Sequence, residues 1–153
     1  MTGCTAITDL ILETFRLNGR LLAAGDALVV DTGLTSARWQ VLGAMALSPV
    51  PLPVAHIARN MGLTRQAVQR LVGEMARAGL VRLAPNPHHQ RAKLVILTQR
   101  GKAAYDAAMK RQGPWASALA NGLTSKQIDA AAAVLRAIRQ RLERNLASGN
   151  SDV

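Results

Sequence analysis

Four side chains between positions 65 and 70 have the hydrogen-bonding chemistry that recognises the edges of DNA bases. They are Arg65, Gln66, Gln69 and Arg70. An arginine can donate two hydrogen bonds to guanine, and a glutamine can pair twice with adenine. A helix whose polar face only meets water usually carries Glu and Lys instead. These residue types therefore predict base recognition in a major groove, provided that a helix presents them.

The segment from Thr64 to Gly79 predicts that helix. Thr64 is a good N-cap, because its hydroxyl can accept a hydrogen bond from a free backbone N–H in the first turn. Gly79 is expected as the C-cap. The apolar residues have the 3, 4 spacing of one buried stripe: Val68, Leu71, Val72 and Met75. This stripe leaves Gln66, Arg70 and Arg77 on the opposite face, with Arg65 and Gln69 beside it.

An ordinary amphipathic helix is the simpler interpretation of this segment taken alone, but the residues before it favour another. A second short helix is predicted by Val54, Ile57, Ala58 and Met61, and it ends at Met61-Gly62-Leu63. Two short helices joined by a Gly-containing turn of about three or four residues form a helix-turn-helix, whose second helix is free to enter a major groove.

The net charge of +10 is concentrated in the same part of the chain. Residues 59–102 carry nine basic residues and one acidic residue, which is eight of the ten net positive charges. A solvated surface normally mixes the two signs, so this bias beside a helix-turn-helix predicts attraction to phosphates. A basic face without a partner is the alternative.

After Gly79 the sequence period changes from helical to extended. Residues 80–83 and 93–97 are expected to form two strands, joined by a polar and basic loop. A hairpin directly after a recognition helix is a wing. It would place Arg91 in or beside the minor groove, and Lys93 is expected to contact the DNA backbone. A solvated hairpin loop is the alternative for Arg91.

The segments before the helix-turn-helix are mostly helical in pattern. Apolar positions from 6 to 29 predict a first helix that loosens near Gly25. Thr35 can cap a second helix that reaches Leu47, with Trp39 on its apolar side. An extended connection is then expected at three prolines: Pro49, Pro51 and Pro53.

Two helices are predicted in the C-terminal third. The first begins at Thr98 and is expected to be interrupted near Gly113-Pro114. The second opens at Leu123-Thr124 and carries a narrow apolar seam: Ile128, Ala131, Ala132, Leu135, Ile138, Leu142 and Leu146. Such a seam is typical of a coiled coil. It can pair with a second chain or pack on the first helix of its own chain.

Composition excludes several other classes. The 153 residues are 49% hydrophobic and 3% aromatic, which fits one helical domain. No apolar run approaches the roughly 18 residues that cross a bilayer, and the N-terminus has no signal-peptide pattern, so we expect a cytoplasmic protein without a membrane partner. Cys4, the single cysteine, excludes an intramolecular disulfide, and nothing near it in sequence favours a redox role.

Neither a catalytic site nor a metal site is expected. The three histidines are His56, His88 and His89, and no helix carries two of them at the spacing of a zinc motif. The sequence contains no glycine-rich phosphate loop and no pattern of an activated serine or cysteine. We therefore expect no enzymatic activity and no cofactor.

The run from Leu34 to Gly101 resembles the winged helix-turn-helix of the MarR family of bacterial transcription regulators. Each piece of the resemblance is weak alone, but the pieces occur in order and with family-like spacing. They are Leu34–Leu42, Ile57–Val68, Gly79–Val81, Asn86-Pro87, Arg91–Lys93 and Leu97–Gly101. The resemblance implies a mainly α fold with a two-stranded β wing, in a dimer whose N- and C-terminal helices intertwine.

On this basis residues 1–153 are expected to form a single MarR-like domain. It comprises a winged helix-turn-helix lobe, 34–98, and a helical dimerisation lobe, 5–31 plus 99–148. The expected function is a homodimeric repressor that binds double-stranded DNA at a near-palindromic operator. DNA contacts are expected from seven residues: Thr64, Arg65, Gln66, Gln69, Arg70, Arg91 and Lys93.

The resemblance also implies a small, often aromatic or phenolic, effector that binds between the dimer helices and the DNA-binding lobe. Phe15, Arg16 and Trp39 are candidate lining residues, although core packing is the stronger interpretation of Phe15 and Trp39. Two alternatives belong to other classes: a winged-helix module that binds protein or RNA, and an enzyme. Repression and activation differ by the position of the operator, which the sequence does not contain.

The chain departs from the family pattern at one position of the wing. The family usually has an acidic residue two positions before the wing arginine, and here that residue is His89. The usual carboxylate partner of Arg91 is therefore missing, which changes what holds the wing. A histidine there adds positive charge when it is protonated, so the sequence predicts modestly tighter DNA binding at pH 6 than at pH 8.

Overall fold

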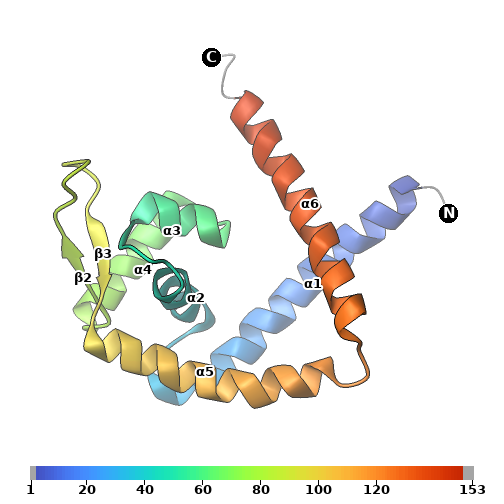
Figure 1. Cartoon of the computed structure of the whole chain (residues 1–153), viewed down its shortest axis with the longest axis horizontal. Helices are drawn as coiled ribbons and strands as arrows, with labels where there is room; N and C mark the ends of the chain where they lie inside the picture. The colour runs from blue at the N-terminus through green and yellow to red at the C-terminus, as the bar shows by residue number, and fades with distance from the viewer. Residues whose placement is uncertain (1–2, 150–153) are drawn as a thin grey trace. The chain divides into compact units, whose positions relative to one another are not determined.

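The computed structural model describes residues 3–149 as a mainly helical chain with a small antiparallel sheet (Figure 1). The helices are α1 (Gly3–Val29), the 3-10 helix η1 (Val30–Thr32), α2 (Ser36–Ala46), α3 (Val54–Met61), α4 (Arg65–Arg77), α5 (Gln99–Ala120) and α6 (Ser125–Gly149). The strands are β1 (Leu52–Pro53), β2 (Val81–Ala84) and β3 (Leu94–Leu97). This architecture confirms the predicted winged-helix fold class.

The chain divides into two compact units after Gly113. The first contains α1 to α4, the sheet and most of α5. The second contains the end of α5 and α6. The expected division into lobes 34–98 and 5–31 plus 99–148 stays a prediction. Residues 1–2 and 150–153 of the expected domain lie outside the described residues.

The hydrophobic core of the first unit lies where α2, α3 and α4 pack together against the sheet. Its largest fully buried side chains include Leu42 from α2, Ile57 from α3 and Met75 from α4. The stripe predicted for the recognition helix is confirmed, since all four members are buried: Val68, Leu71, Val72 and Met75. Burial of this stripe fixes which face of α4 is left for solvent or a partner.

The N-cap of α4 is the residue that the sequence indicated, whereas the C-cap lies one residue before the expected Gly79. The Oγ1 of Thr64 accepts a hydrogen bond from the backbone N–H of Ala67 at 3.1 Å. At the other end Ala78 is the C-cap, and Gly79 follows it with a left-handed φ of 76°. The N–H of Leu80 then donates to the carbonyl oxygen of Met75 at 2.9 Å, as in a Schellman motif.

The turn between α3 and α4 depends on Gly62. Its φ of 66° lies in the left-handed region, which a residue with a side chain rarely adopts. The next residue, Leu63, donates its N–H to the carbonyl oxygen of Ala58 at 3.0 Å and closes the end of α3. The predicted helix-turn-helix is therefore present, with α4 as its second helix.

The sheet has three strands in the order β1-β3-β2, all antiparallel. β2 and β3 form the expected hairpin, each within one residue of its predicted start. The proline-rich connection adds β1, a two-residue strand that was not predicted, in which Leu52 pairs with Val95 and Pro53 with Leu94. A proline is tolerated there because β1 lies at the edge of the sheet, where its missing N–H breaks no ladder.

The sequence predicted a first helix that loosens near Gly25 and a later helix interrupted near Gly113-Pro114, and both expectations were wrong. α1 runs through Gly25, where the missing side chain lets Ser36 approach: a Cβ at Gly25 would overlap the Ser36 Oγ. α5 runs through Gly113 and Pro114. The exposed Pro114 removes one backbone hydrogen bond, which is too little to end a 22-residue helix rich in alanine.

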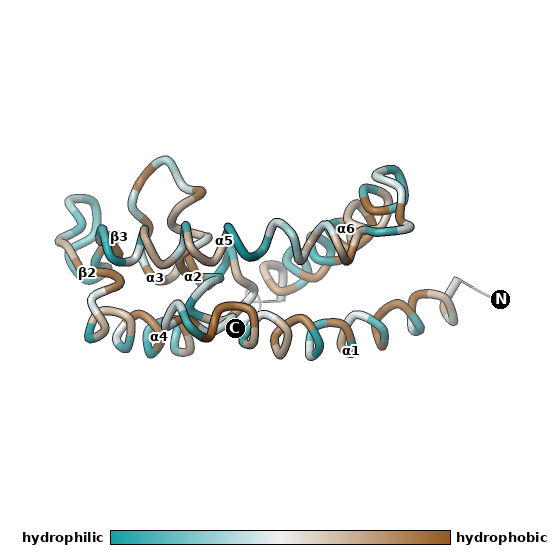
Figure 2. The backbone as a smooth tube through the Cα atoms, turned by 90° about the horizontal axis from the view of Figure 1, so that it is seen from below, coloured by the Kyte–Doolittle hydropathy of each residue, from teal (hydrophilic) through white to brown (hydrophobic). Residues whose placement is uncertain are grey.

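Much of α1 and α6 exposes apolar side chains. Figure 2 colours the hydrophobic residues along the backbone of these helices brown. On α1 they are Ile7, Ile11, Leu12, Phe15, Leu17, Leu21 and Leu22, and on α6 they are Ile128, Val134, Leu135, Leu142 and Leu146. The seam predicted on the last helix is thus largely uncovered in the single chain. None of the helices within residues 3–149 has the length and apolar character needed to cross a bilayer.

Candidate nucleic-acid interface

The exposed face of α4 carries the side chains that the sequence selected for base recognition. A shallow hollow of about 780 Å³ runs along it, lined by Arg65, Gln66, Gln69, Arg70, Gly73 and Arg77. We call this the recognition face. Its arginine and glutamine side chains are all exposed, so their donors and acceptors are available to a bound molecule. The structure therefore brings four of the seven predicted contact residues together on one helix face.

A second concave surface lies between α3, the start of α4 and the wing, and we call it the wing groove. Its volume is about 650 Å³. The polar and charged side chains that line it are His56, Arg59, Arg65, Gln69, Asn86, His89, Arg91 and Lys93. Four of these are cations and none of the lining residues is acidic, so the groove favours polyanions. Arg65 and Gln69 line both surfaces and join them.

The wing turn is held by Asn86 rather than by a carboxylate. The Asn86 Oδ1 accepts a hydrogen bond from the N–H of His88 at 3.0 Å, and its carbonyl oxygen accepts one from the N–H of His89 at 3.3 Å. The N–H of Ala92 donates in turn to the carbonyl oxygen of His89 at 3.2 Å. None of the ion pairs among the described residues includes Arg91, whose side chain is exposed in the groove.

The hydroxyl of Thr64, at the start of the recognition face, can still donate a hydrogen bond. Its Oγ1 accepts from Ala67, and a hydroxyl that accepts still has its own proton to donate. Thr64 is exposed, so a phosphate or base edge can receive that bond.

Comparison with known proteins agrees with this geometry. The sequence profile described as MarR family matches residues 32–92. An uncharacterised protein of Mycobacterium tuberculosis is 34% identical over 138 residues, which is 90% of each chain. The transcriptional activatory protein BadR of Rhodopseudomonas palustris is 30% identical over 99 residues, covering 63% of this chain and 57% of that one. The chain belongs to the MarR family.

Solved structures of similar proteins have the same fold. CouR from Rhodococcus jostii RHA1, in a structure bound to p-coumaroyl-CoA, is 25% identical with a TM-score of 0.76, and the match covers 85% of this chain and 91% of that one. The regulator MosR of M. tuberculosis is 26% identical with a TM-score of 0.72, covering 86% and 95%. The protein is therefore a MarR-family transcription regulator with a DNA-binding winged helix.

The three candidate effector residues of this MarR-family protein are not gathered into one described pocket. Core packing, the stronger interpretation of Phe15 from the sequence, is wrong for the single chain, because Phe15 lies on α1 with 71% of its surface exposed. Its neighbour Arg16 is an exposed residue whose Nη1 donates to the Oε2 of Glu13 at 3.3 Å. Trp39, on α2, packs partly buried against the core, as the sequence suggested. Their role in ligand binding stays a prediction.

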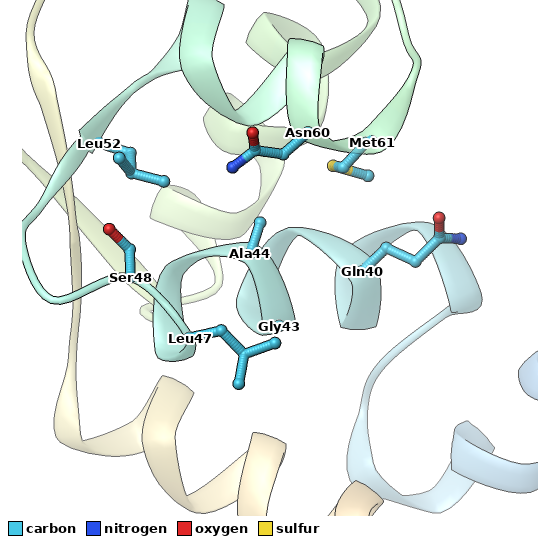
Figure 3. Close-up of a pocket in the computed structure, with 8 residues that line it drawn as sticks. All are labelled: Gln40, Gly43, Ala44, Leu47, Ser48, Leu52, Asn60 and Met61. Atoms are coloured by element: carbon cyan, nitrogen blue, oxygen red, sulfur yellow. The ribbon is translucent and has the colours of Figure 1, made fainter. Parts of the chain in front are cut away.

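A different pocket, of about 560 Å³, lies between α2 and α3 (Figure 3). It is lined by Gln40, Gly43, Ala44, Leu47, Ser48, Leu52, Asn60 and Met61. The figure shows the Asn60 amide above Ala44, with Leu52 and Met61 on either side. The lining contains no charged group, and its amide and hydroxyl groups suit a neutral polar substituent on an apolar body.

Two groove residues, His56 and Arg59, were not selected as site residues from the sequence. They lie on α3 opposite its buried side chains Val54, Ile57 and Ala58, so the helical period does place them on an exposed face. Their convergence with Arg91 depends on how the wing folds back toward α3, which the local sequence pattern does not specify.

The position of His89 in the wing groove leads to a pH prediction. His89 faces the same concavity as four permanent cations, so a positive charge at this position would lie where phosphates are proposed to bind. We expect the ratio of the DNA affinities at pH 6 and pH 8, at constant salt, to be modestly above one. Fluorescence anisotropy at both pH values measures this ratio.

Histidine variants test the same prediction. We expect His89→Gln to reduce the ratio, and His88→Gln to leave it unchanged, because His88 does not line the groove. His56→Gln measures the contribution of the other groove histidine. A His89→Gln variant with the parent's pH dependence would exclude this role.

Proposed function

We propose that this MarR-family protein is a ligand-responsive repressor that binds a near-palindromic operator as a homodimer. The observation that carries the proposal is the continuity of the recognition face with the cationic wing groove through Arg65 and Gln69. A major groove admits one helix, and a basic concavity beside it meets the phosphates that flank the groove.

Seven contacts follow from this arrangement. Five residues at the start of α4 would lie in the major groove: Thr64, Arg65, Gln66, Gln69 and Arg70. Arg91 and Lys93 would contact the backbone and the minor groove from the wing. Arg59 is an eighth candidate, because it lines the wing groove from α3, the helix that crosses the DNA backbone in helix-turn-helix complexes.

The dimer is supported by the apolar side chains that α1 and α6 expose. On α1 Phe15 is 71% exposed, and on α6 Leu142 and Leu146 are 59% and 75% exposed. Monomeric proteins rarely leave many large apolar side chains of one helix uncovered. A second copy would cover them. A two-fold axis then presents two α4 helices to half-sites about 10 base pairs apart, which predicts a near-palindromic operator.

Ligand control is proposed from the likeness to CouR, whose structure is bound to p-coumaroyl-CoA. We propose a small aromatic or phenolic effector for this chain. It would bind near Phe15, Arg16 and Trp39, where the cationic Arg16 can pair with an anionic group, or in the uncharged pocket between α2 and α3. At either place, a bound effector would act by changing the spacing of the two recognition helices.

The test is selection of duplexes from a randomised library by the purified protein, followed by anisotropy titration. We expect an enriched duplex with two related half-sites, bound about 10³-fold more tightly than an unrelated duplex of equal length at the same salt. Light scattering on the complex should give two chains per duplex. Equal, steeply salt-dependent affinity for both duplexes would contradict the proposal, because only phosphate attraction would remain.

A further inference from the structure

One carboxylate interrupts the basic surface of the DNA-binding unit. Glu74 is the only acidic residue between positions 59 and 102. It lies on α4 one turn after Arg70, a member of the recognition face. A carboxylate beside a surface proposed to meet phosphates is unfavourable for binding, so its place there calls for a physical reason.

Glu74 is shared between two arginines from different helices. Its Oε1 lies 3.6 Å from the Nη1 of Arg70, and its Oε2 lies 3.5 Å from the Nη2 of Arg38. Arg38 belongs to α2, so it reaches Glu74 across the packed interface between α2 and α4. Each carboxylate oxygen therefore faces one guanidinium group.

The two ion pairs differ in exposure. The Arg38 and Glu74 side chains are 26% and 31% exposed, whereas Arg70 is 74% exposed. Water screens an exposed pair, so the attraction between Arg70 and Glu74 is weak. At 3.6 Å the atoms are also farther apart than in a good N–H···O hydrogen bond. Of the two ion pairs of Glu74, the one with Arg70 is consequently the pair that can break.

We propose that Glu74 is a positioning residue that raises the specificity of DNA recognition. On an unrelated duplex it keeps Arg70 paired, which lowers the charge that the recognition face offers to phosphates. On an operator Arg70 leaves for a base edge or phosphate, and Arg38 keeps the Glu74 carboxylate paired. This inference rests on the proposed function.

Arg38 is essential to this exchange because of where it is held. Its backbone N–H donates to the Oγ1 of Thr35 at 3.2 Å, in the first turn of α2, and its side chain is half-buried. It can remain on Glu74 while the exposed side chains of α4 turn toward DNA. Without Arg38 the carboxylate would either retain Arg70 or face the phosphates unpaired.

Two variants with opposite charge changes test the inference. Glu74→Gln adds one net positive charge, and Arg38→Met removes one. We expect Glu74→Gln to bind an unrelated duplex about tenfold more tightly at 0.1 M salt, with a salt slope steeper by about 0.9. It should gain little on the enriched duplex. We expect Arg38→Met to weaken the enriched duplex about fivefold and the unrelated one less.

Both variants should therefore lower the ratio of specific to non-specific affinity. If Glu74 acted through net charge alone, Glu74→Gln would tighten both duplexes and Arg38→Met would weaken both, with the ratio unchanged. Glu143→Gln is the matched control, because Glu143 pairs with Arg139 at the same i, i+4 spacing on α6. It should leave both affinities within about twofold of the parent.

The outcomes separate the two proposals. A parent protein that enriches no duplex contradicts the proposed function and the inference that rests on it. A parent with a clear preference, whose ratio both variants retain, overturns the role of Glu74 alone. Melting curves by circular dichroism identify a variant that loses binding through unfolding, and the remaining variant then decides.

Discussion

Replacing Gly101 with alanine is expected to lower the free energy of unfolding by about 3 kcal/mol. Gly101 is buried in the first turns of α5, where a Cβ would overlap the backbone carbonyl oxygen of Leu80 and lie 2.9 Å from the Cδ1 of Leu97. A flexible side chain could turn aside, but a carbonyl oxygen moves only with its backbone. The substitution must therefore displace either α5 or the start of β2.

That displacement would break a network around Thr98. The Thr98 Oγ1 lies 2.7 Å from the carbonyl oxygen of Gly79 and 2.9 Å from that of Leu80, within donating distance of both. The same oxygen accepts from the N–H of Gly101 at 3.0 Å. These hydrogen bonds connect the beginning of α5 to the segment that follows α4. Their loss would therefore also destabilise the C-terminal end of α4.

Thermal unfolding at fixed protein concentration measures the effect. For a chain of this size we expect Tm to fall by about 6 to 12 °C. Gly113→Ala is the matched control, since Gly113 lies in the same helix and a Cβ there meets nothing within 4 Å. It should leave Tm unchanged or raise it slightly, because alanine favours a helix by up to about 1 kcal/mol. Equal Tm values for the two variants would refute the predicted clash.

The sequence correctly predicted the features that depend only on residues close together in the chain. The stripe from Val68 to Met75 follows a helical period, and a helix with one apolar face must bury that face. Thr35 and Thr64 cap α2 and α4 as expected, because a cap needs only a side-chain oxygen and a free N–H a few residues away. The resemblance to the MarR family is likewise confirmed by the family match.

The features that the sequence did not predict depend on distant parts of the chain. β1 is only two residues long, and it exists because Leu52 pairs with Val95 of the neighbouring strand β3. Gly25 weakens α1 by its own propensity, but the approach of Ser36 gives that glycine a packing role. Gly113-Pro114 was expected to interrupt a helix, yet the turns of α5 on both sides of Pro114 continue without its N–H.

The residues of the candidate site also divide into those that the local sequence predicted and those that depend on distant parts of the chain. The helical period placed Gln66 and Arg70 on the face opposite the buried stripe and Arg65 and Gln69 beside that face, and in the structure all four line one hollow. The wing groove and the Arg38–Glu74 pair join residues from separate elements, so no local pattern indicates them. Which of these side chains contact DNA stays a prediction. The most direct test is at the residues that line both the recognition face and the wing groove.

The double substitution Arg65→Ala and Gln69→Ala is expected to weaken binding of the enriched duplex about 100-fold and to remove most of its sequence preference. Both side chains line the recognition face and the wing groove, so they lie at the corner where base edges and phosphates are both within reach. A good bidentate contact to a base is worth about 1–3 kcal/mol, and a loss of about 3 kcal/mol in total corresponds to the predicted factor.

The unrelated duplex should lose much less affinity, because only one of the two substituted residues carries a charge and non-specific binding depends mainly on charge. Anisotropy titrations of both duplexes at several salt concentrations separate these effects. Lys110→Ala removes the same charge from an exposed position on α5 that lines neither surface. It should keep the parent's preference. If the double variant instead weakens both duplexes by the same factor, Arg65 and Gln69 act as phosphate contacts, and base recognition must come from elsewhere on α4.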